Sequence, residues 1–337
     1  MKTRLNNLEP RWLLIITFFA AGAFLGGLSL YIWIGIQTPL GKKIHLTQSI
    51  YKYINPLIAV EFSEKKSTVG NQALELSLQS LIDNKKRNKN ISEAAIYLRE
   101  IETGKWAGIN ENSNISPGKL LRIPIMIAYF NQAQLNPEVL NEKLTFKASD
   151  SKNEKFIFQP AELLRVNQDY TVNELIEKMI VGSDFNAANL LFDNINKDYL
   201  NEVFSDLGIN FQEEKETQDF IPLKLYSLFF RILYNATYLN REFSEKALNL
   251  LAKTYDNEIG ISAGLPKNIS TARSFGARSF NVNDKSIFEM YSCGIIYIKS
   301  PYLLCADVKG ENLNDLKNFF KEIGLVTYKE MIYKYGE

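Results

Sequence analysis

Histidine is almost absent from this 337-residue chain, and its scarcity excludes several kinds of active site. The single imidazole, His45, lies shortly after an apolar segment, so no histidine is present in the rest of the chain to act as a general base. A Ser-His-Asp triad is therefore excluded from the globular part. Only two cysteines accompany that histidine, which excludes the usual histidine-containing zinc site, and we expect neither a metal nor a cofactor.

The chain also lacks an excess of charge of either sign. Lys and Arg total 39, Asp and Glu total 38, and the formal net charge is +1. Nucleic-acid-binding domains are usually strongly basic, so we expect no nucleic-acid partner. Apolar residues make up 46% and charged residues 23% of the chain, which is typical of a folded protein and excludes a disordered or collagen-like one.

One long hydrophobic run lies near the N-terminus. The 25 residues from Trp12 to Ile36 carry no formal charge. At ~1.5 Å rise per residue, a helix of this length exceeds the ~30 Å thickness of the hydrocarbon layer, and a cleaved signal peptide has an apolar core of only roughly 7 to 15 residues. We therefore expect one uncleaved transmembrane helix, which places the chain in the cytoplasmic membrane as a single-pass protein.

Positive charges flank this run almost equally, so the positive-inside rule does not decide its orientation. They are Lys2, Arg4 and Arg11 before the run and Lys42, Lys43 and Lys52 after it. The predicted organisation is an N-terminal tail over residues 1–11, an anchor over residues 12–36, a connector over residues 37–70 and a globular domain over residues 71–337. Apolar residues of the connector are expected to pack on the domain.

The pattern of apolar residues predicts an α+β domain. Helical spacing predicts a helix over residues 72–82, and a capping box at Thr171 and Glu174 begins another helix that runs to Ile180. Strands are predicted over residues 94–98, 106–109, 270–276, 287–298 and 302–308. Further helices are predicted over residues 186–194, 224–239, 244–253 and 314–323. Strands at both ends of the domain therefore enclose a helical insert.

The segment from Met179 to Leu191 reads MIVGSDFNAANLL. It resembles the S-D-N segment of class A β-lactamases and penicillin-recognising serine hydrolases, a resemblance that extends over residues 70–334. The resemblance implies a β-lactamase/transpeptidase-like fold, in which an antiparallel sheet built from both chain ends packs against a helical subdomain. Ser183 and Asp184 match the motif, but Phe185 replaces the asparagine and lacks its hydrogen-bonding amide. On local grounds, the same Ser-Asp pair is equally a cap for the helix that follows.

The family that this segment resembles uses three short motifs around one cleft, namely S-x-x-K, S-D-N and K-T-G, and it needs no histidine. Serine and lysine three residues apart lie on one helical face, so the lysine amine can accept the hydroxyl proton while backbone N–H groups hold the oxyanion. The K-T-G strand binds the substrate carboxylate. Deacylation in class A enzymes also uses a Glu-x-x-Leu-Asn segment, which this sequence lacks.

The first motif is altered. The segment from Lys119 to Pro124, KLLRIP, matches the family's context, and this register puts Lys119 at the serine position and Arg122 at the lysine position. An arginine stays protonated and cannot act as a base. A literal S-x-x-K also exists from Ser116 to Lys119, which leaves two interpretations open. Ser116 is the nucleophile of an active Ser-Lys hydrolase, or it is a helix N-cap residue before Pro117, which the capping preference favours.

The third motif is altered as well. The segment from Thr271 to Gly276, TARSFG, stands where the family has K-T-G, and alignment on Gly276 puts Ser274 in place of the lysine. Arg273 should point away from the cleft because adjacent strand residues face opposite sides, and Arg278 reaches the cleft side only if the strand stays regular. We expect both arginines to be exposed charges at the sheet edge.

The two cysteines, Cys293 and Cys305, fall on the two strands of the predicted final hairpin. An extracytoplasmic location permits a disulfide, but a slip of one residue in register would put the thiols on opposite faces. Because cysteine is among the residues most often buried, we expect two buried free thiols.

Together, the anchor and the altered motifs predict a membrane-anchored, extracytoplasmic β-lactamase-like pseudoenzyme. The cleft positions taken from the resemblance are Ser116, Lys119, Arg122 and Ser183 for catalysis and Phe185, Ser274 and Gly276 for substrate binding. A peptidoglycan-like or β-lactam-like ligand, or an envelope protein, would be its partner. One alternative is an active hydrolase of β-lactams or D-Ala-D-Ala peptides that uses Ser116 and Lys119. Another is a structural domain that makes no use of the cleft.

Overall fold

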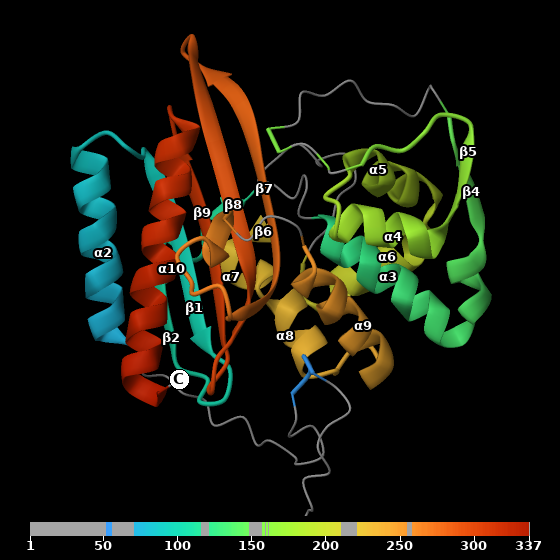
Figure 1. Ribbon diagram of the computed structural model, residues 1–337, viewed down its shortest axis with the longest axis horizontal. Helices are drawn as coiled ribbons and strands as arrows, with labels where there is room; N and C mark the ends of the chain where they lie inside the picture. The colour runs from blue at the N-terminus through green and yellow to red at the C-terminus, as the bar shows by residue number, and fades with distance from the viewer. Residues whose placement is uncertain are drawn as a thin grey trace, which may run out of the picture. The chain divides into compact units, whose positions relative to one another are not determined.

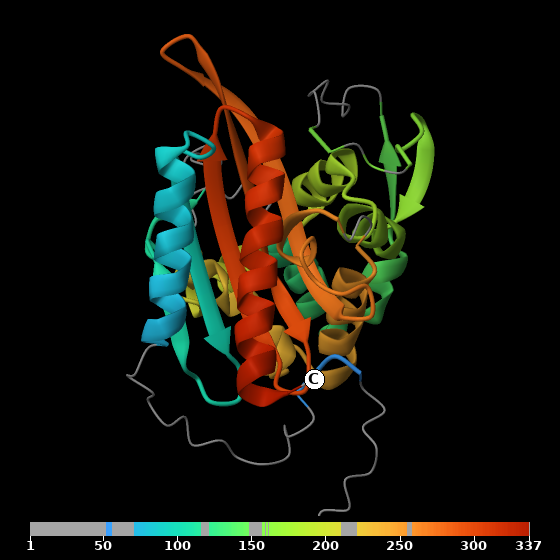
Figure 2. The same ribbon diagram turned by 60° about the vertical axis from the view of Figure 1, so that its left-hand side comes forward.

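An antiparallel five-stranded sheet lies between two helical layers (Figure 1). The computed structural model describes residues 52–55, 71–115, 121–147, 157–158, 160, 162–209, 221–254 and 258–336. Helices α2 (Gln72–Arg87) and α10 (Leu313–Tyr335) lie side by side on one face of the sheet, as Figure 2 shows, and the α-helices between residues 122 and 252 lie on the other side. This is the α+β arrangement that the sequence predicts.

The sheet joins the two ends of the domain in the strand order β2-β1-β9-β8-β7. Its strands are β1 (Glu93–Glu100), β2 (Trp106–Ile109), β7 (Ser270–Val282), β8 (Lys285–Tyr297) and β9 (Tyr302–Gly310). Strand β1 pairs with β9 along its full length, from Glu93 opposite Lys309 to Glu100 opposite Tyr302. The prediction that strands from both chain ends enclose a helical insert is therefore confirmed.

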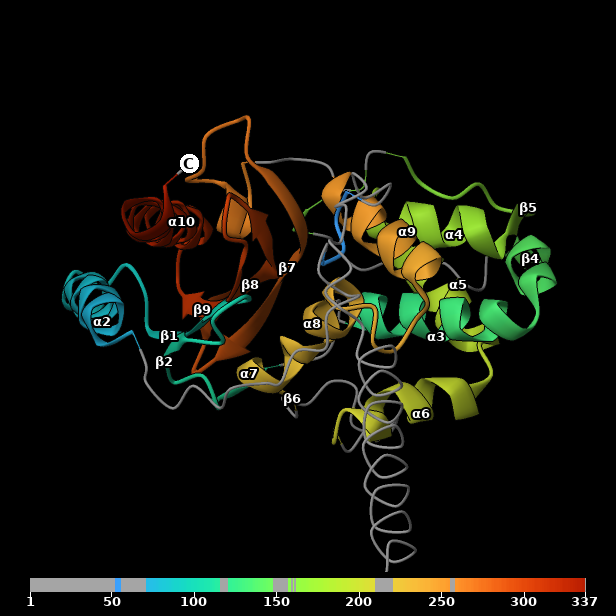
Figure 3. The ribbon, with the colours of Figure 1, turned by 90° about the horizontal axis from the view of Figure 1, so that it is seen from below.

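The helical part lies between β2 and β7 in the sequence, and Figure 3 shows α7 and α8 between the sheet and the other helices. Its helices are α3 (Arg122–Leu135), α4 (Val172–Ile180), α5 (Phe185–Asn194), α6 (Lys197–Asp206), α7 (Leu223–Tyr226), α8 (Leu228–Tyr234) and α9 (Arg241–Ala252). Two short strand pairs accompany them, β3 (Asn114–Ile115) with β6 (Ile221–Pro222) and β4 (Lys143–Phe146) with β5 (Gln168–Thr171). The 3-10 helices are η2 (Pro137–Asn141) and η5 (Gly260–Ser262).

The predicted capping box at the start of α4 is confirmed. The backbone N–H of Glu174 donates to Thr171 Oγ1 at 3.2 Å, and the backbone N–H of Thr171 donates to the Glu174 carboxylate at 2.7 Å. These two bonds satisfy amides that the first turn of a helix leaves without partners.

Several predicted helices have different bounds in the structure, and two of them differ most. The helix expected over residues 224–239 is divided into α7 and α8, and α8 ends at Tyr234 because Ala236 adopts a left-handed conformation with φ of 45°. The closing helix expected over residues 314–323 continues to Tyr335. Gly324 does not stop it but permits close packing, since a Cβ there would lie 2.7 Å from the carbonyl oxygen of Ile261.

Two apolar cores lie on the two faces of the sheet. The core between the sheet and the helical part includes α3, which is buried almost throughout from Arg122 to Phe130. The core on the other face includes Phe275 and Phe320, contributed by β7 and α10. Neighbouring residues of β7 therefore face different cores, as alternation along a strand requires.

Helices in the described ranges are all too short or too polar to cross a membrane. The predicted anchor over residues 12–36 lies outside those ranges, as does most of the connector. Residues 52–55 are described and pack on the domain, where Tyr53 is 8% and Ile54 is 4% exposed. This agrees with the expected packing of the connector.

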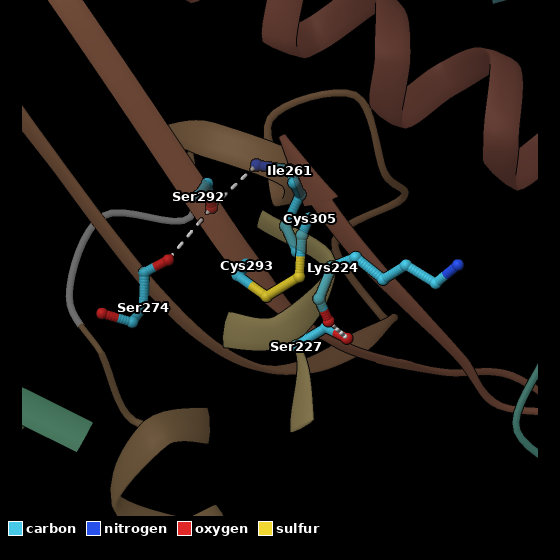
Figure 4. The surroundings of a disulfide bond; sticks show 7 residues. All are labelled: Lys224, Ser227, Ile261, Ser274, Ser292, Cys293 and Cys305. Atoms are coloured by element: carbon cyan, nitrogen blue, oxygen red, sulfur yellow. Dashed lines mark hydrogen bonds between the residues drawn. A yellow bond between two sulfur atoms is a disulfide. The ribbon is translucent and has the colours of Figure 1, made fainter. Parts of the chain in front are cut away.

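Cys293 and Cys305 form a disulfide, so the expectation of two free thiols is wrong. They are direct cross-strand partners on β8 and β9, which puts both side chains on the same face of the sheet. That face looks toward the helical part, where Ser227, between α7 and α8, lies close to the disulfide (Figure 4). The sequence alone does not determine this register, and a shift of one residue would have separated the thiols.

Removing the disulfide should lower the stability of the domain. It joins residues separated by 12 positions, and a cross-link of this span restricts the unfolded chain enough to stabilise the folded state by about 3 kcal/mol. We expect the variant with Cys293→Ala and Cys305→Ala to show a free energy of unfolding lower by about 2–4 kcal/mol in urea denaturation. Alkylation of both cysteines in the unreduced, denatured parent chain would contradict the disulfide.

Candidate functional site

The three altered motifs meet between the sheet and the helical part. Arg122 begins α3, Ser183 precedes α5 and Ser274 lies on β7, and these residues are 4%, 6% and 6% exposed. Ser116 and Lys119 lie outside the described residues. The structure therefore describes the region around the predicted base position and the substrate strand.

Arg122 fixes the turn that carries the second motif. Its Nη2 donates a hydrogen bond of 3.0 Å to the carbonyl oxygen of Ser183. Burial raises the pKa values of Asp184, Tyr226 and Tyr291, and the positive charge of Arg122 partly opposes this rise in each of them. One buried guanidinium is therefore electrostatically coupled to groups from the α4–α5 turn, α7 and β8.

The turn between α4 and α5 is fixed by its backbone. A Cβ at Gly182 would lie 2.8 Å from the carbonyl oxygen of Lys178, so this position needs a glycine. Ser183 has φ of 55°, a left-handed conformation that is strained for a residue other than glycine. The bond from Arg122 to the Ser183 carbonyl helps to hold this conformation in place.

Asp184 caps α5, and this interpretation of the Ser-Asp pair is confirmed. Its Oδ1 accepts hydrogen bonds from the backbone N–H groups of Asn186 at 2.8 Å and of Ala187 at 3.2 Å. The side chain is almost fully buried, and burial raises its pKa, while the backbone donors and the charge of Arg122 act in the opposite direction. The carboxyl group is thus committed to the helix cap and to balancing the buried arginine.

Phe185 is the first residue of α5 and is half-buried. It occupies the third position of the S-D-N motif. Its ring has no group that can donate or accept a conventional hydrogen bond, whereas an asparagine would offer both kinds. The described turn therefore lacks the amide that the resemblance assigns to this position.

Two tyrosine side chains fill the space beside the substrate strand. Ser274 hydrogen-bonds the side chain of Tyr226, which is fully buried on α7. Tyr291 on β8 is the cross-strand partner of Gly276, and a Cβ on that glycine would lie 2.1 Å from the tyrosine Oη. Gly276 is therefore needed for the close approach of the Tyr291 ring, and both substrate-strand positions contact the protein's own side chains.

The expectation of two exposed arginines on β7 is wrong for Arg273, which is buried. Arg278 is only partly exposed. Arg273 is 1% exposed, and its guanidinium lies 4.9 Å from the ring centroid of Phe275 on the opposite face to the cleft. Arg278 has a half-buried side chain that pairs with the carboxylate of Glu289, which Lys309 also contacts at 3.4 Å. Because strand β7 stays regular, Arg278 is on the cleft side, where its charge is balanced by Glu289.

Tyr226, Tyr291 and Glu289 did not emerge from the sequence motifs. The position of Tyr291 opposite Gly276 follows from the β7–β8 register, which is set by a two-residue turn at Asn283 and Asp284 with φ of 49° and 63°. An Asn-Asp pair tolerates these angles and was a usable signal for that turn. The place of Tyr226 depends on the packing of α7, for which no local pattern exists.

The described groups of this region offer little acid–base chemistry near neutral pH. Arg122 stays protonated, and burial raises the pKa values of Tyr226 and Tyr291. Asp184 accepts the bonds that begin α5. Among the residues that the structure describes here, the side chains of Arg122, Tyr226 and Tyr291 are buried, and neither a guanidinium nor a tyrosine with a raised pKa acts as a general base near neutral pH.

The raised pKa of Asp184 should produce a measurable pH dependence. A carboxyl group whose pKa is raised by folding above the ordinary 3.8 binds its proton more tightly in the folded chain, so the free energy of unfolding falls as the pH rises from about 3.8 through the folded value. The variant Asp184→Asn keeps an oxygen for the α5 cap but carries no charge. In urea titrations between about pH 4 and 7, we expect the free energy of unfolding of this variant to fall less steeply with rising pH than that of the parent chain.

The comparison between variant and parent uses only the change in the free energy of unfolding with pH. Its absolute value is not compared, because losing the charge near Arg122 alters stability at every pH. The matched control is Asp193→Asn, which changes an exposed aspartate of the same helix and should keep the parent slope. A slope for Asp184→Asn that equals that of the parent would contradict the buried, raised carboxyl group.

Comparison with solved structures shows that the fold is that of β-lactamases and penicillin-binding proteins. A structure of the TLA-1 extended-spectrum β-lactamase is 17% identical with a TM-score of 0.66, and 78% of this chain and 100% of that chain are covered. A β-lactamase from Chitinophaga pinensis is 14% identical with a TM-score of 0.65 over 77% and 99% of the two chains. The structure of PBP-A is 18% identical with a TM-score of 0.64 over 79% and 98%.

No curated protein matches the sequence. The pattern of a protein family matches it over residues 73–331, which is most of the predicted domain. That family is Beta-lactamase2, described as a beta-lactamase enzyme family. The fold and the family match agree with the resemblance drawn from the S-D-N segment, and this chain is therefore a divergent member of the beta-lactamase enzyme family.

Proposed function

We propose that this protein is a membrane-anchored, extracytoplasmic β-lactamase-like domain without hydrolase activity. The observation that carries the proposal is the place of Arg122, a buried guanidinium that bonds the Ser183 carbonyl at the position where the family has its lysine base. A guanidinium cannot accept the proton of a nucleophilic hydroxyl group at physiological pH. In this proposal the lysine base has become a structural cation.

The substrate side of the cleft supports the same proposal. The position of the family's K-T-G lysine is held by Ser274, which hydrogen-bonds Tyr226, and the nearby charge of Arg278 is balanced by Glu289. Tyr291 packs against Gly276. A substrate carboxylate would therefore meet no free cation from these positions and would have to displace a buried tyrosine ring, which is costly in a packed interior.

An oxidising location is supported by the disulfide between Cys293 and Cys305. Such bonds persist in secreted and periplasmic proteins and are rare where thiols are kept reduced. With an anchor over residues 12–36 and a connector over residues 37–70, the domain over residues 71–337 would lie on the outer side of the cytoplasmic membrane. A peptidoglycan-like ligand or an envelope protein is the class of partner we propose for it.

Hydrolysis of a chromogenic cephalosporin tests the loss of activity. We expect no turnover above that of the buffer by the full chain and by its Lys119→Ser variant, because the introduced hydroxyl would still face Arg122 instead of a base. We also expect none from the double variant with Lys119→Ser and Arg122→Lys, which restores a serine and a lysine three residues apart but leaves Phe185 and Ser274 unchanged.

A Ser116→Ala variant completes the series. Ser116 and Lys119 form the literal S-x-x-K of the sequence, so they are the residues that an active Ser-Lys hydrolase would use. Turnover in the parent chain that disappears with Ser116→Ala would refute the proposed inactivity and establish the alternative, an active hydrolase. An authentic class A β-lactamase assayed in the same buffer serves as the positive control.

A further inference from the structure

The connector joins the domain at a clasp on its surface. The carboxylate of Glu245 on α9 accepts hydrogen bonds from three consecutive backbone N–H groups, those of Lys52 at 2.7 Å, Tyr53 at 2.8 Å and Ile54 at 3.0 Å. The hydroxyl group of Tyr297, at the end of β8, donates to the Tyr53 carbonyl at 3.1 Å. The two tyrosine rings meet edge to face, 5.3 Å apart. The clasp therefore holds the connector between α9 and β8.

Several turns and the C-terminal helix end close to this clasp. The turn after β8 bonds the turn after β1, with Ser300 Oγ donating to Glu102 at 3.0 Å. Near the end of α10, Lys334 pairs with Glu100 at the end of β1. Residues 52–55 and the end of α10 lie at the lower end of the view in Figure 1, away from the β7–β8 turn. We call this part of the surface the connector end.

The connector end carries a mainly apolar groove of about 320 Å³ beside an exposed cation. Its lining includes Ile269, Tyr297, Ile298, Lys299, Tyr328 and Ile332. Tyr297 therefore belongs to both the clasp and the groove. Directly after Ile332 on α10, Tyr333 is 92% exposed, the largest exposed fraction among the big apolar side chains that the structure describes. Lys52 is exposed at the same end.

We propose that the connector end rests on the membrane surface and that the groove takes an anionic phospholipid of the bilayer. The inference rests on the anchor proposed above. The hydrocarbon part of the lipid would lie against Ile298 and Ile332, and its phosphate would lie beside the ammonium group of Lys299. Tyr333 would sit at the headgroup level, which is the depth that amphipathic aromatic rings favour.

The length of the connector supports a lipid as the occupant. The predicted anchor ends at Ile36, so residues 37–51 separate it from the clasp at Lys52. A fully extended chain of this length spans about 50 Å, and any less extended conformation brings the connector end closer to the bilayer. Exposed lysines beside an apolar groove also match the chemistry of an anionic lipid, which has a negative headgroup and an apolar body.

A nitroxide at position 333 of the full chain tests the contact with lipid. The two native cysteines are paired in a disulfide, so Tyr333→Cys introduces one free thiol for the label at a fully exposed position. The control is Val282→Cys at the far end of the β7–β8 hairpin, where the native side chain is 45% exposed. Collisions with oxygen report contact with lipid, and collisions with a water-soluble nickel chelate report contact with water.

In vesicles of anionic phospholipid, we expect the label at position 333 to shift from nickel-accessible to oxygen-accessible and the label at position 282 to stay in water. Adding Lys299→Gln, or raising the salt to about 1 M, should return the label at position 333 toward water, because both weaken attraction to the phosphate. An aqueous label at position 333 would overturn the proposal. So would equal lipid exposure in zwitterionic vesicles, or spin–spin broadening that indicates a second copy as the occupant.

The anchor itself is tested separately by washing the same vesicles with alkaline carbonate. A chain released by the wash would refute the anchor, whatever the label reports. A chain that stays in the membrane while position 333 remains aqueous would refute only the contact of the connector end with lipid. The two failures are therefore distinguishable.

Discussion

The arrangement of the altered cleft depends on one buried positive charge, the guanidinium of Arg122. A charge in a protein interior is costly unless hydrogen bonds and opposite charge offset its lost hydration. Arg122 also begins α3, where the helix dipole disfavours a cation. The carbonyl of Ser183 and the nearby carboxyl of Asp184 compensate it. The same two residues form the strained turn and the cap of α5, so the cation and the second motif stabilise each other.

The substituted positions behave as one packing unit. Ser274 bonds Tyr226, Tyr291 covers Gly276, and Glu289 balances Arg278, so each feature that a substrate would use is joined to a side chain of the protein. Both tyrosines are electrostatically coupled to Arg122. Tyr226 and Tyr291 themselves belong to the apolar core between the sheet and the helical part, so these positions are packed as part of that core.

Much of the fold could be predicted because its signals are local. The capping box at Thr171 identifies the start of α4, and alternation along β7 puts Arg273 on the face opposite Ser274. Features that depend on strand register or on packing could not be predicted from such local signals. The disulfide needs Cys293 opposite Cys305, and the burial of Arg273 contradicts the usual exposure of arginine. Gly324 is typical of a helix end, yet here it lies inside α10 and allows contact with η5.

The intact mass of the chain after incubation with benzylpenicillin is the most direct test of the proposed loss of hydrolase activity. A hydrolase of this fold forms a covalent bond between its nucleophile and the β-lactam carbonyl, and that adduct persists where deacylation is slow, as expected for a sequence without the Glu-x-x-Leu-Asn segment. With Arg122 at the proposed base position and Tyr291 beside the proposed substrate strand, we expect a mass that does not change over hours at saturating penicillin. A stoichiometric adduct of one penicillin that maps by peptide analysis to Ser116 or Lys119 would contradict it.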